Sequence, residues 1–172
     1  MHPISSCVAA LCCALFTAVA AAQADTAPEI ERAYRSGDRE AALHRLEQAI
    51  TASPRDAQLR FLKGVLLAES GRSAEAAEVY FRLTQEYPEL PEPYNNLAVL
   101  QAQQGQLEQA REALETALRN DPSYSTAHEN LGDVYVRLAL REYGRANNTQ
   151  SPGLQHKLEL ARQLLARPSH GS

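Results

Sequence analysis

The sequence predicts an all-α fold: a solenoid of about three to four antiparallel helix pairs, with a capping helix at its C-terminal end. Two observations predict it. Alanine, leucine, glutamate, arginine and glutamine dominate the 172 residues, and these side chains favour helices because they lose little rotational freedom there. Glycine, alanine and proline also recur with one shared spacing of 34 residues. The recurring residues are Gly37, Gly71 and Gly105, then Ala42, Ala76 and Ala110, and then Pro54, Pro88 and Pro122.

Each recurring residue type has a place in a helix pair. The glycines are expected where the first helix ends in a left-handed residue, because glycine adopts that conformation without a Cβ penalty. The prolines are expected where the second helix stops, because proline lacks a backbone donor and clashes with the preceding turn. The recurring alanines are expected where the second helix approaches the first closely. The matching small residues on the first helix are Gly64, Ala98 and Gly132.

The first segment, residues 1–24, differs from the rest of the chain and is predicted to be a signal peptide. It contains no Asp, Glu, Lys or Arg, it has an apolar stretch from Val8 to Ala22, and it ends in the small-x-small sequence Ala22-Gln23-Ala24. Cleavage is expected after Ala24, which places the mature protein in the periplasm or outside the cell. Because the apolar stretch approaches a membrane-spanning length, an uncleaved inner-membrane anchor remains the alternative.

The repeats are expected to follow this segment and to fill residues 25–146. In the last repeat, the residues that match the second-helix pattern occur about five residues earlier than the 34-residue spacing places them. We therefore expect one nearly continuous helix from Ser125 to Arg145. A polar break and an amphipathic helix come next, and that helix is expected to cap the open apolar end of the stack. The boundaries are approximately 25–56, 57–90, 91–124 and an atypical 125–146 for the repeats, 147–153 for the linker, 154–167 for the capping helix and 168–172 for the tail.

The clearest copy of the unit runs from Pro91 to Asn120 and closes with Pro122. Its pattern positions are Tyr94, Leu97, Ala98, Gly105, Ala110, Leu114 and Ala117. This pattern resembles the tetratricopeptide repeat, here in an exported bacterial protein, and the resemblance covers roughly residues 26–146. The preceding copy departs from the family pattern at Lys63 and Arg60, where leucine or an aromatic residue is usual.

The resemblance implies a right-handed superhelix whose concave groove is lined by the first helix of each repeat. In family members with peptide grooves, asparagines at the positions of Asn96 and Asn130 grip the backbone of the ligand. A carboxamide suits that task because it offers both a donor and an acceptor. The alternative is that these asparagines only bridge adjacent repeats. The further groove candidates are Asn95, Gln103, Lys63, Glu129 and Arg137, and the basic residues among them do not follow the spacing of a carboxylate clamp.

The sequence lacks the residue patterns that nucleic-acid binding, metal or cofactor binding, and catalysis require. No cluster of five or more Lys or Arg occurs, so binding to nucleic acid is not expected. All three cysteines lie within residues 1–24, and no two of His44, His128 and His156 share a helical face, so neither a metal site nor a cofactor is expected. No catalytic constellation is apparent, and an enzyme is not expected.

The function that remains is a non-catalytic scaffold or adaptor in the bacterial cell envelope that binds a protein or peptide partner. We expect it to be a monomer or a weak homo-oligomer. The alternative is a structural, self-assembling or membrane-tethered accessory subunit of an envelope assembly or secretion complex.

Overall fold

A computed structural model of the chain describes residues 26–146 and 152–166, which form eight helices and no strand. The predicted signal peptide lies outside the described residues, as do most of the polar linker and the tail. The helices are α1 (Ala27–Arg35), α2 (Arg39–Ala52), α3 (Ala57–Glu69), α4 (Ser73–Glu86), α5 (Pro91–Gln103), α6 (Leu107–Asn120), α7 (Ser125–Arg145) and α8 (Pro152–Ala166).

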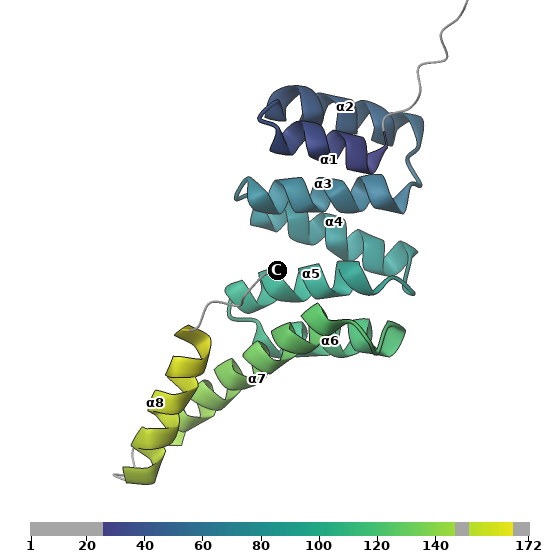
Figure 1. Cartoon of the computed structure of the whole chain (residues 1–172). Helices are drawn as coiled ribbons and strands as arrows, with labels where there is room; N and C mark the ends of the chain where they lie inside the picture. Colours follow the sequence, from purple (N-terminus) through teal and green to yellow (C-terminus); the bar gives the residue numbers. More distant parts are fainter. Residues whose placement is uncertain (1–25, 147–151, 167–172) are drawn as a thin grey trace, which may run out of the picture.

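The helices stack in chain order as antiparallel pairs, and the predicted all-α solenoid is confirmed (Figure 1). The pairs are α1 with α2, α3 with α4, and α5 with α6. Each helix packs on the helices before and after it in the chain, and α1 also contacts α3 while α5 contacts α7. Along the stack, α1 therefore lies next to α3, and α5 lies next to α7.

The recurring glycines and prolines set the ends of the helices as predicted. Gly37, Gly71 and Gly105 have φ angles of 103°, 77° and 78°, in the left-handed region that favours glycine. After Gly71 the amide of Arg72 donates to the carbonyl of Leu67 at 2.9 Å, and the amide of Gln106 donates in the same way to Gln101 at 2.9 Å. These bonds satisfy carbonyls at the end of the first helix.

The second helices end at residues 52, 86 and 120, two residues before each recurring proline. Because proline cannot continue a helix, each one fixes the start of the turn into the next pair.

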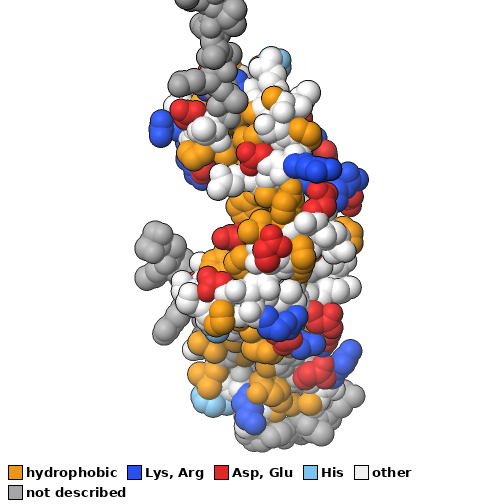
Figure 2. All heavy atoms as spheres, turned by 90° about the vertical axis from the view of Figure 1, so that its right-hand side faces the viewer, with side chains coloured by type: hydrophobic (Ala, Val, Ile, Leu, Met, Phe, Trp, Pro, Cys, Tyr) orange, Lys and Arg blue, Asp and Glu red, His pale blue; other side chains and the backbone are white. Residues whose placement is uncertain are grey.

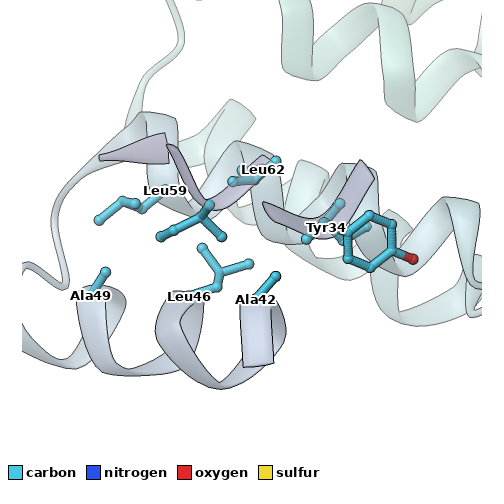
Figure 3. Close-up of a cluster of buried hydrophobic side chains, with 8 residues drawn as sticks. Tyr34, Ala42, Leu46, Ala49, Leu59 and Leu62 are labelled. Atoms are coloured by element: carbon cyan, nitrogen blue, oxygen red, sulfur yellow. The ribbon is translucent and has the colours of Figure 1, made fainter. Parts of the chain in front are cut away.

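The recurring alanines lie in the centre of the core. Ala42, Ala76 and Ala110 are each 0% exposed, as expected for small residues at which two helices pack closely. Figure 3 shows one such layer, in which Leu46 and Ala42 of α2 face Leu59 and Leu62 of α3. In the next pair, a Cβ at Gly64 would lie 2.5 Å from a ring carbon of Tyr80, so the glycine makes room for the tyrosine.

The fourth unit is a single long helix, and one expectation about it is wrong. The spacing groups Gly132 with the small residues at which paired helices pack closely, but among the described residues nothing lies within 4 Å of a Cβ built there. The reason is that α7 continues to Arg145 without folding back, so no hairpin partner crosses at Gly132. The distal half of α7 packs instead against α8, which buries Leu158 and Ala161 (Figure 1).

Candidate binding groove

Three cavities lie in a row between the first helices and share lining residues. The largest has a volume of about 440 Å³ and lies between α1, α3 and α5. The second, of about 240 Å³, shares Val65 with it. The third, of about 90 Å³, shares Val99 and Gln103 with the second and reaches α7. The shared residues make the three cavities one groove, which we call the first-helix groove.

The 440 Å³ cavity is predominantly apolar with an acidic edge. Its walls include Phe61, Leu62 and Val65 of α3, together with residues at the start of α5. The ring of Phe61 is held by that of Tyr80, with ring centroids 5.6 Å apart. The ionisable residues that line this cavity are Glu31 and Glu92, and no lysine or arginine lines it. Figure 2 shows one face of the stack, on which hydrophobic side chains lie exposed between the helix pairs beside acidic ones.

The rest of the groove is more polar, and a chain of side-chain hydrogen bonds runs beneath it. The amide of Asn130 donates to Asn95 at 2.8 Å, Asn95 donates to Asn96 at 3.1 Å, and Asn96 donates to the hydroxyl of Tyr80 at 3.1 Å. Asn95 is only 3% exposed, so these bonds satisfy a carboxamide that would otherwise be costly to bury. The chain links α7 to α5 and α5 to α4.

The asparagines therefore bridge adjacent repeats, which was the alternative to a ligand-binding role. The bridge does not use all of their hydrogen-bonding capacity, because each of the donated bonds takes one of the two N–H groups of a carboxamide. Asn96 lines the 240 Å³ cavity and Asn130 the 90 Å³ cavity. Both can offer their second N–H to a chain in the groove, so the ligand-binding role remains a prediction.

Burial of Tyr80 alters its acidity. Tyr80 is 1% exposed, and this burial raises the pKa of its hydroxyl to about 12, although the hydrogen bond from Asn96 acts in the opposite direction. The hydroxyl therefore stays neutral in the physiological range and serves as a fixed acceptor for Asn96.

The remaining predicted groove residues divide into two groups. Gln103 lines two of the cavities, and Arg137 lines the 90 Å³ cavity while donating to the carbonyl of Ala102 at 3.3 Å. Glu129 is exposed on α7 but lines none of the three cavities. Lys63 points toward α2, where its Nζ lies 2.8 Å from Glu47, and it lines none of the three either.

The basic residues of α3 are thus held away from the groove. Arg60 forms an ion pair with Glu86 of α4 and lies over the ring of Tyr87. Together with the position of Lys63, this leaves Arg137 as the one basic residue among the lining residues of the three cavities.

Sequence analysis missed the apolar half of the groove. The predicted groove residues centred on the asparagine positions, and the equivalent of Asn96 one repeat earlier is the apolar Leu62. A signal was present, because Val65 and Val99 are 34 residues apart and so occupy the same position on successive first helices. Both valines line the groove, where successive first helices leave their side chains partly uncovered.

Within residues 26–146 and 152–166, no helix is both long and apolar enough to cross a membrane. Over the same residues, no group of three or more His, Asp or Glu side chains is arranged to hold a metal ion.

Comparisons with known proteins agree with this architecture. A family model described as tetratricopeptide repeat matches residues 28–91, and a second described as TPR repeat matches residues 101–138. A TPR repeat-containing thioredoxin of Arabidopsis thaliana is 41% identical over 83 residues, which is 48% of this chain but 12% of that protein. The chain therefore spans far less than two thirds of that relative.

Several solved structures share the fold. MamA from Desulfovibrio magneticus RS-1 has a TM-score of 0.57 and 19% identity, and the match covers 83% of this chain and 76% of that one. A thermophilic TPR protein of Thermus thermophilus has a TM-score of 0.57 and 24% identity, with 80% of each chain covered. The pilF protein of Pseudomonas aeruginosa has a TM-score of 0.59 and 21% identity, and the match covers 78% of this chain and 59% of that one.

Proposed function

Because this chain belongs to the tetratricopeptide-repeat proteins, we propose that it is a non-catalytic scaffold of the bacterial cell envelope that holds a protein or peptide partner in the first-helix groove. The repeat class supports the general role of an interaction scaffold. The location, the groove as the binding surface and the absence of catalysis are our proposals.

The observation that carries the proposal is the continuity of the groove. Cavities of about 440, 240 and 90 Å³ follow one another across four helices through shared residues. A groove of this length suits a stretch of polypeptide better than a small molecule, which binding sites usually enclose on most sides. The row of backbone-binding groups that such a stretch needs is offered by Asn96 and Asn130.

A blocking substitution tests the groove. We expect wild-type protein, used as bait in envelope extracts, to recover a protein partner. Gln103→Trp should reduce that recovery strongly, because it places a bulky ring where the 240 Å³ and 90 Å³ cavities meet. Gln109→Trp is the matched control, because Gln109 is also an exposed glutamine but lies on α6, outside the groove. Equal recovery with both variants would argue against the groove as the binding surface.

The envelope location rests on residues 1–24, with their uncharged apolar stretch and the Ala22-Gln23-Ala24 site. Mass spectrometry of the protein purified from its native cells is the test. A mature N-terminus at Asp25 is the expected result. A chain that retains Met1 would instead favour a membrane-anchored scaffold.

A structural subunit is the second candidate function, and the end of the stack favours it. Leu160 and Leu164 of the capping helix α8 are 47% and 58% exposed, and they lie one turn apart. An apolar strip at the end of a solenoid could join copies end to end. Light scattering distinguishes the two functions, because assembly through α8 predicts a mass that rises with concentration and falls with Leu164→Lys.

A further inference from the structure

We infer that the partner segment carries a large apolar side chain flanked by lysine or arginine, with the apolar side chain in the cavity between α1, α3 and α5. This inference rests on the proposed function and adds the chemistry of the partner to it.

The shape and the walls of the cavity point to an apolar side chain. At about 440 Å³ it has room for an aromatic or large aliphatic group together with adjacent backbone. Phe61, Leu62 and Val65 supply apolar walls from α3, while Leu90 and Pro93 close the side formed by α5. An aromatic side chain buries about 150–250 Å² when enclosed, and this is the kind of contact that dominates binding at interfaces.

The charges around the cavity point to basic neighbours. Its two ionisable residues, Glu31 and Glu92, are both acidic, and the adjoining cavity adds Glu69. Arg35 is the cation that offsets part of this charge, since it lies 2.8 Å from Glu31 and 3.5 Å from Glu69. Among the described residues Glu92 forms no ion pair, so its charge is available to a ligand.

An acidic partner fits the same surface poorly. It would bring carboxylates next to Glu31 and Glu92. The basic residues of α3 are already engaged elsewhere, because Arg60 and Lys63 are paired with Glu86 and Glu47. Because Glu92 is exposed and the side chain of Glu31 is 40% exposed, the discrimination is expected to be modest and to weaken as salt is added.

A random library supplies an unbiased test. Phage displaying random twelve-residue peptides are selected on the purified protein, and the selected peptides are synthesised with a photoreactive group to locate their binding surface. We expect enriched peptides to carry Phe, Leu, Met or Tyr within two positions of Lys or Arg, and to crosslink to α3 and α5. Replacing the apolar residue by alanine should weaken binding about tenfold or more.

Charge reversal at the cavity provides the matched comparison. Glu92→Lys should weaken the selected peptides about two- to fivefold, an effect that rising salt should remove. Glu112→Lys, the same change at an exposed position on α6, should leave binding unchanged.

The outcomes separate this inference from the proposed function. Peptides that crosslink to the groove but lack basic residues, or that bind Glu92→Lys more tightly, overturn the inference and leave the groove as a binding site. A selection in which no peptide crosslinks to α1, α3, α5 or α7, including one in which a second copy of the chain fills the groove, overturns both.

Discussion

Two glycines from different positions of the repeat have opposite effects in the folded chain. Gly105 ends α5 with a φ of +78°, a conformation that costs other residues about 1–2 kcal/mol. Gly132 lies inside α7 with open space around it, and there glycine weakens the helix by about 0.5–1 kcal/mol relative to alanine. The first glycine is required by the turn, whereas the second serves no packing role among the described residues.

Alanine substitutions test this contrast. Gly105→Ala should lower the free energy of unfolding by about 1–2 kcal/mol because of backbone strain. Gly132→Ala should raise it by about 0.5–1 kcal/mol because the helix is strengthened. Urea unfolding followed by circular dichroism measures both. If Gly132→Ala proves destabilising, α7 has a close partner at that position and its packing is not as described here.

Tyr80 gives the chain a specific response to high pH. Its pKa of about 12 in the folded chain exceeds its ordinary value of 10.0, so the folded state holds the proton more tightly than the unfolded state. The resulting stability is fully present below pH 10 and is lost as the pH rises toward 12.

A pH series of unfolding measurements tests the role of Tyr80. Wild-type protein should lose about 1–3 kcal/mol more than Tyr80→Phe between pH 10 and 12. At neutral pH the variant should be about 1 kcal/mol less stable, because Asn96 loses its acceptor. Equal alkaline losses in the two proteins would show that Tyr80 is not buried in this way.

At the scale of the helices, α8 is held by a narrow apolar strip. Leu158 and Ala161 are buried against α7, whereas Leu160 lies largely in solvent. Because α7 is one long helix, its distal half has no hairpin partner, and α8 takes that place. The capping role of α8 therefore depends on very few side chains.

Two leucine truncations on α8 measure this role. Leu158→Ala should cost about 2 kcal/mol, the lower end of the range for buried leucines. Leu160→Ala is the matched control and should change stability by less than about 0.5 kcal/mol. Hydrogen exchange should show that Leu158→Ala also loosens the distal part of α7. Equal effects of the two substitutions would contradict the packing of α8 on α7.

An exposed ion pair joins α6 to α7. Arg141 donates to Glu108 at 2.5 and 2.9 Å, and these bonds hold the pKa of the Glu108 carboxyl below its ordinary value of 4.5. A lowered pKa adds stability that is present above the ordinary value and is lost as the pH falls through the folded value. Glu108→Gln should therefore lower the melting temperature at pH 7, and the difference from wild type should shrink at acidic pH. A constant difference would assign the effect to packing.

At the scale of the whole molecule, the spacing of 34 residues was enough to predict the pairs and their turns, and the departure from that spacing in the last repeat predicted the long α7. It succeeded because Gly71 or Pro88 acts through local backbone geometry, which is the same in every repeat. The apolar half of the groove was missed because it depends on which side chains remain uncovered between repeats, as with Phe61 and Val65. The packing of Gly132 was predicted wrongly because its place in the repeat matches Gly64 and Ala98, whereas the continuous helix around it has no paired helix at that point.

Photocrosslinking in the native cells tests the central claim most directly. A photoreactive amino acid is placed at Gln103, where the 240 Å³ and 90 Å³ cavities meet, and separately at Gln109 on α6. The account predicts that Gln103 gives a crosslinked adduct with a second protein, which mass spectrometry identifies, and that Gln109 gives none. Adducts at Gln109 without any at Gln103 would show that partners bind the opposite side of the stack, and would contradict the account.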